Sequence, residues 1–330
     1  MSDVILNNIY KSYNKGNVKA VKNVSFEVEK GELFGLIGPD GAGKTSIFRI
    51  LTTLLLPDSG TAFVNGLDVS KDIKSIRSIV GYMPGKFSLY QDLSVEENLN
   101  FFATLFNTTV EENYDLIKDI YVQLEPFKTR KAGKLSGGMK QKLALCCALI
   151  HRPKVLFLDE PTTGVDVVSR REFWEMLKRL KKQEITILVS TAYMDEATMC
   201  ERIALIQNGE IMSIETPQKI IDNYSDNLYA IRSKNMSRLL NDLREIDEIK
   251  SCNAFGEYHH ITFHESEADR YKNDNQNGIR KSAEFSQIEK LAEKLEQLQH
   301  IDIEIKQVEP TIEDCFIALM GNDQNIKNIE

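Results

Sequence analysis

The sequence lacks any apolar run that approaches the roughly 20 residues of a membrane-spanning helix. Its N-terminus, Met1-Ser2-Asp3-Val4, also lacks the charged-then-apolar pattern of a secretory leader. Lys and Arg number 41 against 49 Asp and Glu, and they form no dense basic block. A general nucleic-acid-binding protein needs a basic surface, so no nucleic-acid partner is expected. We therefore expect a cytoplasmic protein that contacts a membrane only through a partner.

Cysteine is scarce, and the few cysteines show no Cys-x-x-Cys spacing that would indicate a metal site or a redox motif. They are Cys146, Cys147, Cys200, Cys252 and Cys315. An odd, sparse set of this kind favours buried free thiols in a reducing compartment. The length of 330 residues, with 42% apolar and 27% charged residues, predicts about two ordinary globular domains.

The clearest motif is a phosphate loop of the pattern G-x-x-x-x-G-K-[ST]. It consists of Gly38, Pro39, Asp40, Gly41, Ala42, Gly43, Lys44 and Thr45. The apolar segment Leu33–Ile37 predicts a buried strand before the loop, and Ser46–Leu51 predicts a helix after it. In such a loop, backbone N–H groups and the helix N-terminus bind oxyanions. Lys44 would reach the β- and γ-phosphates and Thr45 would bind Mg²⁺, so the motif predicts a polyphosphate ligand.

An acidic pair follows a second apolar strand, Val155–Leu158. The pair is Asp159 and Glu160, at the carboxyl end of a strand that reads as buried and parallel. Open α/β sheets place their ligands at this edge. We therefore expect Asp159 to hold Mg²⁺ and Glu160 to orient or deprotonate an attacking water.

A second glycine-containing loop, Leu135-Ser136-Gly137-Gly138-Met139, precedes the apolar helical segment Leu143–Leu149. A serine and two glycines at the start of a helix suit an anion, but Ser136 could equally serve as a simple N-cap.

Tyr13 also has two interpretations. It lies at the end of the first of two predicted strands, 4–9 and 20–28. Its ring could stack on a base or pack at a sheet edge, and local evidence favours packing.

Two further signals organise the same part of the chain. Ser94-Val95-Glu96-Glu97 is a capping box that opens a helical stretch to about residue 130, which predicts a helical insertion within an α/β fold. Asn208-Gly209 lies between two short apolar segments and predicts a tight β-hairpin.

Together these motifs resemble the ATP-binding subunit of an ABC transporter over residues 3–222. The loop 38–45, residues 135–139, residues 155–160 and Gly164-Val165-Asp166 correspond to Walker A, signature, Walker B and D-loop. The resemblance implies ATP and Mg²⁺ as ligands, with Mg²⁺ on Thr45 and Asp159 and catalysis by Glu160 and Lys44. It also implies nucleotide contacts from Tyr13, the phosphate loop with Ser46, and Asp159, and from Ser136, Gly137, Gly138 and Asp166.

The resemblance also implies partners. Two such domains dimerise head to tail, so that each ATP lies between the phosphate loop of one domain and the signature of the other. A second ATPase domain, identical or different, and a separate transmembrane permease are therefore expected. The assembled protein would lie at the inner face of the cell membrane.

Two positions depart from the family pattern. Gly85 stands where the family usually has glutamine, and Ala192 stands where it usually has histidine. Gln91 lies six residues after Gly85 and is a poor substitute because such alignments rarely slip so far. An alanine methyl cannot hydrogen-bond a γ-phosphate or an attacking water. Either the branch works without these side chains, or this chain's own phosphate-loop site is slow.

Residues 223–330 read as β-α-β-β-α-β, the order of a small ferredoxin-like domain. Its last strand is expected at 301–308, and the polar gap 269–278 is expected to be a mobile loop. His259, His260 and His264 are expected to be exposed strand histidines rather than metal ligands. The segment Glu309–Phe316 resembles the tail of multidrug and antibiotic exporters.

The expected architecture is a P-loop α/β ATPase domain with an antiparallel β subdomain and a helical insertion at about 94–150, followed by a small α+β domain. The boundaries are 1–222 for the ATP-binding domain and 223–330 for a regulatory or dimerisation domain. The expected function is ATP binding and hydrolysis that drives an ABC exporter. The alternative is a nucleotide-gated subunit that hydrolyses little and completes the ATP site of a catalytic partner.

Overall fold

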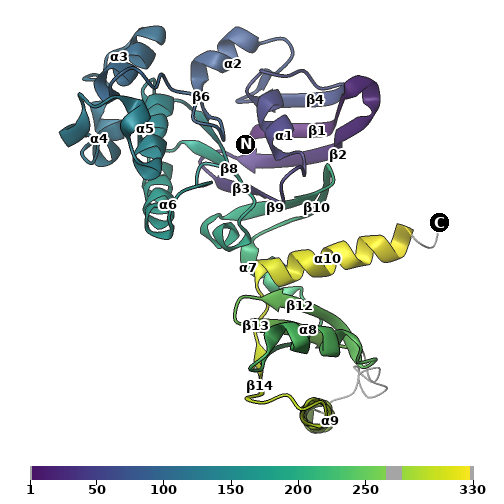
Figure 1. Ribbon diagram of the computed structural model, residues 1–330. Helices are drawn as coiled ribbons and strands as arrows, with labels where there is room; N and C mark the ends of the chain where they lie inside the picture. Colours follow the sequence, from purple (N-terminus) through teal and green to yellow (C-terminus); the bar gives the residue numbers. More distant parts are fainter. Residues whose placement is uncertain (1, 265–276, 328–330) are drawn as a thin grey trace. The chain divides into compact units, whose positions relative to one another are not determined.

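The computed structural model describes residues 2–264 and 277–327 (Figure 1). Two compact units divide the chain. One runs from the N-terminus to Ile220 and also includes the C-terminal segment that begins at Phe316, and the other is Ile221–Cys315. The sequence assigns this C-terminal segment to the second domain, whereas the structure groups it with the first unit.

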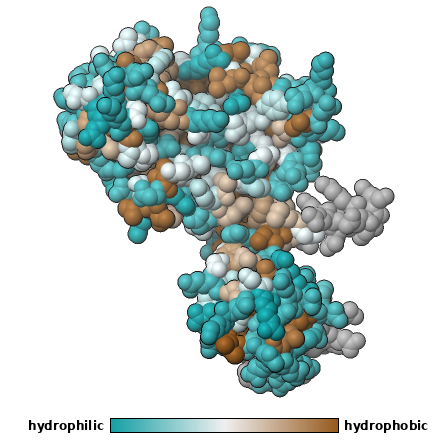
Figure 2. Space-filling model, in the orientation of Figure 1, coloured by the Kyte–Doolittle hydropathy of each residue, from teal (hydrophilic) through white to brown (hydrophobic). Residues whose placement is uncertain are grey.

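The described helices and the visible surface bear on whether the chain could cross a membrane. No described helix is both long and apolar enough to cross a bilayer. Figure 2 shows mostly hydrophilic side chains on the visible face, with apolar side chains in separate patches. All five cysteines are buried and form no disulfide bond, as expected from their spacing.

A six-stranded sheet forms the centre of the first unit. Its strands are β3 (Leu33–Ile37), β6 (Val80–Met83), β7 (Val155–Asp159), β8 (Thr186–Thr191), β9 (Arg202–Gln207) and β10 (Glu210–Glu215). Their spatial order is β10-β9-β3-β8-β7-β6, and every pair is parallel except the β9–β10 hairpin. Carboxyl ends of parallel strands meet at one edge of a sheet. The residues that follow β3, β7 and β8 therefore lie close together.

A four-stranded antiparallel sheet accompanies the central sheet, as the sequence predicts. Its strands are β1 (Ser2–Tyr13), β2 (Val18–Glu29), β4 (Ser59–Val64) and β5 (Leu67–Asp68), in the order β2-β1-β4-β5. The first two strands are longer than the predicted segments 4–9 and 20–28. The predicted hairpin at Asn208-Gly209 is also confirmed, because both residues have positive φ between β9 and β10.

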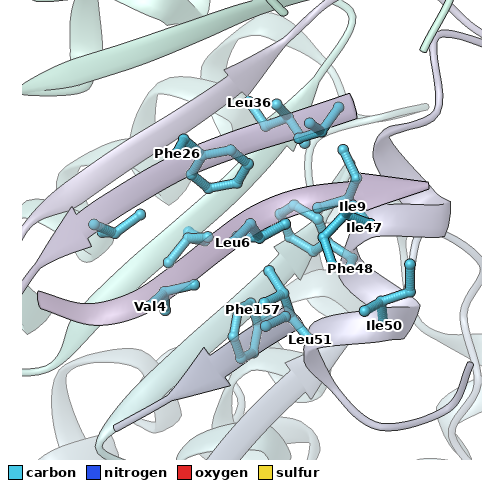
Figure 3. Packing of buried hydrophobic residues seen from close by; sticks show 14 of the residues in the cluster. Val4, Leu6, Ile9, Phe26, Leu36, Ile47, Phe48, Ile50, Leu51 and Phe157 are labelled. Carbon is cyan, nitrogen blue, oxygen red and sulfur yellow. The ribbon is translucent and has the colours of Figure 1, made fainter. Parts of the chain in front are cut away.

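The core joins the helix after the phosphate loop to both sheets (Figure 3). This helix, α1 (Lys44–Leu51), buries Ile47, Phe48, Ile50 and Leu51 completely. Phe48 meets Phe157 of β7 edge to face, with 5.9 Å between ring centroids. The contact ties the helix that begins the nucleotide site to the strand that ends in Asp159.

The remaining helices of the first unit include the predicted insertion. They are α2 (Ile73–Ile79), α3 (Val95–Leu105), α4 (Tyr114–Tyr121), α5 (Gly137–Leu149), α6 (Val167–Lys181) and α7 (Pro217–Asp222), which continues past the unit boundary. The capping box is confirmed, since the Glu97 N–H donates to Ser94 Oγ at 3.1 Å and the Ser94 N–H donates to Glu97 Oε2 at 2.7 Å. Figure 1 shows α3, α4 and α5 side by side, and α5 packs against both α3 and α4.

The second unit contains a four-stranded antiparallel sheet in the order β12-β13-β11-β14. The elements are β11 (Leu228–Arg232), α8 (Met236–Arg244), β12 (Ile249–Phe255), β13 (Tyr258–Phe263), α9 (Asn277–Gln297) and β14 (Glu304–Val308), with α10 (Ile312–Lys327) following. The succession and the strand order confirm the ferredoxin-like prediction. The last strand begins at Glu304 rather than at 301 because Asp302 has a left-handed φ of 57°.

The histidines of β13 correct the expectation of exposed side chains. His259 and His260 are buried, and only His264 is exposed. His259 Nε2 lies 2.7 Å from the Met236 carbonyl oxygen, while His260 Nδ1 lies 2.8 Å from Asp314 Oδ1. Alternate strand residues face opposite sides of a sheet, and here both sides supply a partner.

No metal cluster accompanies these histidines within residues 2–264 and 277–327, where no group of three or more His, Cys, Asp or Glu residues could hold a metal ion. The polar gap 269–278, which the sequence predicts to be a loop, lies mostly outside the described residues.

The core contact of α1 gives a stability prediction. Phe48→Ala should lower the free energy of unfolding by about 3–5 kcal/mol, because it removes a fully buried ring and leaves a cavity. Urea unfolding can be followed through the fluorescence of Trp174, the only tryptophan and itself buried. Phe101→Ala is the matched control, since 40% of that residue is exposed. Equal losses from the two substitutions would contradict the role assigned to the Phe48–Phe157 packing.

Candidate active site

The phosphate loop is pressed against two strands at positions where only glycine fits. An ideal Cβ at Gly38 would lie 2.1 Å from the carbonyl oxygen of Ile206 on β9. At Gly43, where φ is +104°, a Cβ would lie 2.3 Å from the carbonyl oxygen of Ala20 on β2. The Gly38 N–H also donates to the Thr191 carbonyl at 3.2 Å. The loop is therefore held in place from both sides before α1 begins.

Lys44 places its cation inside this loop. Its side chain is 3% exposed, and Nζ donates to the carbonyls of Gly38 at 2.6 Å and Pro39 at 3.0 Å. Nζ also lies 3.2 Å from Glu160 Oε1. The structure thus brings the predicted phosphate-binding cation and the predicted base to one point.

Asp159 is buried beside two hydroxyl groups. Its Oδ1 accepts from Ser190 Oγ at 2.6 Å and from Thr45 Oγ1 at 3.3 Å. Carboxylate and hydroxyl oxygens are ligands that Mg²⁺ prefers, and Mg²⁺ usually takes few protein ligands besides phosphate and water. The pair of Thr45 and Asp159 therefore fits a magnesium site.

Glu160 adopts a left-handed backbone conformation with φ of +50°. Its N–H donates to both the carbonyl and the hydroxyl of Ser190, each at 3.0 Å. A non-glycine residue in this region is strained unless its surroundings hold it there, and such strain concentrates at functional sites. The turn directs the Glu160 carboxylate toward Lys44.

Ser190 belongs to none of the motifs that the sequence reveals. The available signal was its place at the end of the apolar strand Ile185–Val189, beside the end of the strand that carries Asp159.

Tyr82 on β6 is a second neighbour of the acidic pair. Burial, reinforced by the Asp159 carboxylate, raises the pKa of Tyr82 to about 12, while Arg49 opposes the shift. The phenol therefore stays neutral near the site.

Tyr13 lies beside the helix that follows the phosphate loop. Its hydroxyl and the Ser46 hydroxyl are 3.0 Å apart. The end of β1 thus reaches the edge of the phosphate site. Stacking of Tyr13 on adenine stays a prediction.

The signature serine and the D-loop aspartate form a separate cluster at the starts of two helices. Ser136 caps α5 by accepting from the Met139 N–H at 3.4 Å. Asp166 caps α6 by accepting from the N–H groups of Val168 at 3.1 Å and Ser169 at 3.0 Å. The bonds from Ser169 lower the pKa of Asp166 below its usual value.

The two helix starts lie next to each other. An ideal Cβ at Gly138 would lie 2.8 Å from Ser169 Oγ, so α5 begins in close contact with α6. Among the described residues, no hydrogen bond joins Ser136 or Asp166 to Lys44. Within one chain the structure therefore holds two separate clusters, one around the phosphate loop and one around the signature.

The two departing positions lie at the site. An ideal Cβ at Gly85 would be 3.1 Å from the Asp159 carbonyl oxygen and 3.7 Å from Glu160 Cβ. Gln91 instead lies beside Gly133, whose N–H donates to the Gln91 carbonyl at 2.9 Å. The position beside the acidic pair therefore carries no side chain.

Ala192 directly follows β8, and its neighbour Tyr193 does not take over the role of a histidine. The Tyr193 ring packs against the Arg170 guanidinium, 4.3 Å from the ring centroid. The aromatic side chain after Ala192 is thus engaged with α6.

A parallel sheet with a phosphate loop after one strand and an acidic pair after another defines the class of P-loop nucleotide-binding domains. The family model described as ABC transporter matches residues 21–163. DrrA, the doxorubicin resistance ATP-binding protein of Mycobacterium tuberculosis, is 31% identical over 325 residues, which cover 96% of this chain and 93% of DrrA. The chain belongs to the ABC transporter family of ATP-binding proteins.

Two further comparisons extend this result. YbhF of Escherichia coli, a probable multidrug ABC transporter ATP-binding protein, is 43% identical over 237 residues. These residues cover 71% of this chain but only 41% of YbhF. The ATP-binding cassette MJ0796, solved as a dimer in a post-hydrolysis state with ADP and phosphate, superposes with a TM-score of 0.59 at 26% identity. The superposition covers 64% of this chain and 98% of that cassette.

The burial of Lys44 gives a binding prediction. Lys44→Ala should weaken ATP binding about tenfold to a hundredfold, because a hydrogen bond to a charged group is worth roughly 1.5–3 kcal/mol. Calorimetric titration with ATP measures the change, and Lys74→Ala, at an exposed lysine of α2, is the control. Unchanged affinity in the Lys44 variant would show that the phosphates bind elsewhere.

Proposed function

We propose that this chain hydrolyses ATP to drive an ABC exporter through a separate membrane subunit. The observation that carries the proposal is the meeting of four side chains at one sheet edge. Lys44 lies 3.2 Å from Glu160, and Thr45 lies 3.3 Å from Asp159. This is the set needed to bind a nucleoside triphosphate and to activate a water against its terminal phosphate.

The roles of these residues follow from their charges. Lys44 and the loop N–H groups neutralise and orient the β- and γ-phosphates. The Glu160 carboxylate, partly exposed and next to Lys44, accepts a hydrogen bond from the attacking water and takes its proton. Thr45 and Asp159 would hold Mg²⁺, which when bound supplies positive charge to the phosphate oxygens. The products are ADP and phosphate.

The proposed cargo is a small or amphiphilic substrate. The name of DrrA refers to doxorubicin resistance and that of YbhF to multidrug transport, and the tail Glu309–Phe316 resembles that of such exporters. The domain 223–330 contributes none of the residues assigned to catalysis, so we assign it a regulatory or dimerisation role.

The proposed membrane partner docks on a hollow of about 740 Å³ in the first unit, whose lining does not include Lys44. Apolar side chains such as Phe102, Leu105 and Phe106 of the helical insertion line it, together with Leu54 after α1. Leu54 is 56% exposed and Leu105 is 60% exposed. Exposed apolar side chains around a hollow support binding of an apolar partner segment. In this arrangement the chain lies in the cytoplasm against the inner face of the membrane.

The separation of the two clusters supports a head-to-tail dimer. Ser136, Gly137, Gly138 and Asp166 start helices away from Lys44, so they are available to a nucleotide held by a second ATPase domain. MJ0796, to which the chain is similar, is described as a dimer. One chain would then supply two half-sites, its phosphate loop to one ATP and its signature to the other.

A second candidate is a nucleotide-gated subunit that hydrolyses little and completes a partner's site. Gly85 beside the acidic pair and Ala192 after β8 favour it, because neither has a side chain that can hydrogen-bond a phosphate or a water. ATP turnover by the isolated chain discriminates the two candidates.

Restoring the missing imidazole tests the cause of slow turnover. Ala192→His should raise the rate of ATP hydrolysis toward the gain of about 10²–10³ expected for one oriented donor. Steady-state phosphate release measures it, with Ala192→Leu as a control of comparable bulk that donates no hydrogen bond. A rate that stays at the wild-type level in the histidine variant would show that position 192 does not limit hydrolysis.

The two half-sites can be separated by substitution in the assembled complex. If the partner carries the better site, Ser136→Arg should lower hydrolysis more than Glu160→Gln, because it blocks the partner's γ-phosphate. Both variants are assayed in the reconstituted complex beside the isolated chain. Fast hydrolysis by the isolated chain, abolished by Glu160→Gln, would instead assign turnover to this chain's own phosphate loop.

A further inference from the structure

A buried carboxylate outside the assigned site connects three of its segments. Glu196 lies in the short 3₁₀ helix η4 (Met194–Met199) after β8 and is 3% exposed. Its Oε2 accepts from Thr191 Oγ1 at 2.6 Å and from Thr162 Oγ1 at 3.0 Å. Its Oε1 accepts from Arg170 Nε at 3.2 Å. A buried carboxylate is costly unless it is paired, and here each bond comes from a different segment.

Each bond of Glu196 leads toward a functional segment. Thr191 accepts the Gly38 N–H of the phosphate loop on its carbonyl oxygen, at 3.2 Å. Thr162 lies two residues after Glu160. The Arg170 N–H donates to the Asp166 carbonyl at 2.9 Å, in the turn that opens α6. These hydrogen bonds, joined through the covalent structure of Thr191 and Arg170, connect the phosphate loop through Glu196 to the D-loop.

The arginine in this series is held rigidly. Besides Glu196, its Nη2 donates to Asp195 Oδ2 at 2.8 Å, and its guanidinium packs on the Tyr193 ring. A planar guanidinium that is held at several points moves together with its partners, whereas a flexible lysine side chain could change its own conformation instead. Thr162 and Thr191 are each 1% exposed, so water does not compete for their bonds to the carboxylate.

We propose that Glu196 is a positioning residue that couples occupancy of the phosphate loop to the placement of the D-loop. The inference rests on the proposed binding and hydrolysis of ATP at the Lys44 site. Glu196 acts through Thr191 and Arg170. Phosphate binding shifts the loop at Gly38, and the bonds of Glu196 carry this shift to Asp166 at the start of α6. A partner nucleotide then meets a D-loop whose position depends on this chain's own ligand.

Glu196→Gln isolates the link to Arg170, because a glutamine oxygen can still accept from both threonine hydroxyls while the charge facing Arg170 is lost. We expect the ATP dissociation constant to stay within about twofold of wild type, and kcat to fall about tenfold or more, as for misplacement of a catalytic group. Arg170→Met should give a similar loss. The double variant should be no slower than either single variant, because both remove the same link. Arg171→Met, at an exposed arginine on the same helix, is the matched control and should leave kcat unchanged.

A second measurement does not need hydrolysis. With Mg²⁺ and a non-hydrolysable ATP analogue, wild-type protein should show slower backbone hydrogen exchange over residues 163–170, and Glu196→Gln should lose this response while still binding the analogue. If wild type binds the analogue but never hydrolyses ATP, the proposed activity fails and the exchange result still decides the coupling.

Two outcomes would overturn the coupling, and both are distinct from a folding defect. One is an unchanged exchange response in Glu196→Gln, and the other is a loss of kcat and of ATP affinity by the same factor. Should Glu196→Gln not fold, Arg170→Met tests the same link, since that arginine side chain is 17% exposed and its truncation leaves the threonine bonds in place.

Discussion

The pairing of buried parallel strands is the constraint on which the rest of the first unit depends. Every residue of β3, β7 and β8 is buried, so their backbone groups must pair within the sheet. The register places Ile37 opposite Thr191 and Asp159 opposite Ser190. Residues that end these strands therefore come level with one another, and the phosphate loop, the acidic pair and the Ser190-Thr191 hydroxyls gather at one edge.

Burial at that edge means that the charged side chains there must be compensated by neighbouring groups. Lys44 and Asp159 are nearly inaccessible to water, so each needs compensation from neighbouring groups. Glu160 and two carbonyls compensate Lys44, while two hydroxyls compensate Asp159. A polyanionic ligand with a divalent cation can join the same groups. We expect the absence of hydrogen-bonding side chains at Gly85 and Ala192 to affect the transition state more than ligand binding, because neither position belongs to these pairs.

The signature cluster follows a different principle. Its residues gain their places from helix capping rather than from strand ends, since Ser136 and Asp166 each satisfy N–H groups at the start of a helix. Glu196 lies between the two arrangements, bonded both to the end of β8 and to α6. It thereby gives the strand-end cluster a rigid connection to a helix start.

The sequence alone determined the features whose chemistry is local. The phosphate loop, the acidic pair, the capping box at Ser94 and the Asn208-Gly209 hairpin depend on residues a few positions apart, so pattern and propensity suffice. Strand alternation and order likewise predicted both domains' folds. The extents of several strands differed, because a single left-handed residue such as Asp302 delays the start of a strand that the apolar pattern would begin at residue 301.

Only the tertiary structure decided which distant residues pair. Glu196 meets Thr162 and Arg170 from 34 and 26 residues away, and Ser190 meets Asp159 from 31 residues away. His260, which looked exposed in sequence, is buried against Asp314, 54 residues further on. A single sequence carries no signal for such contacts, because the packing of whole elements brings the groups together and no local pattern records it.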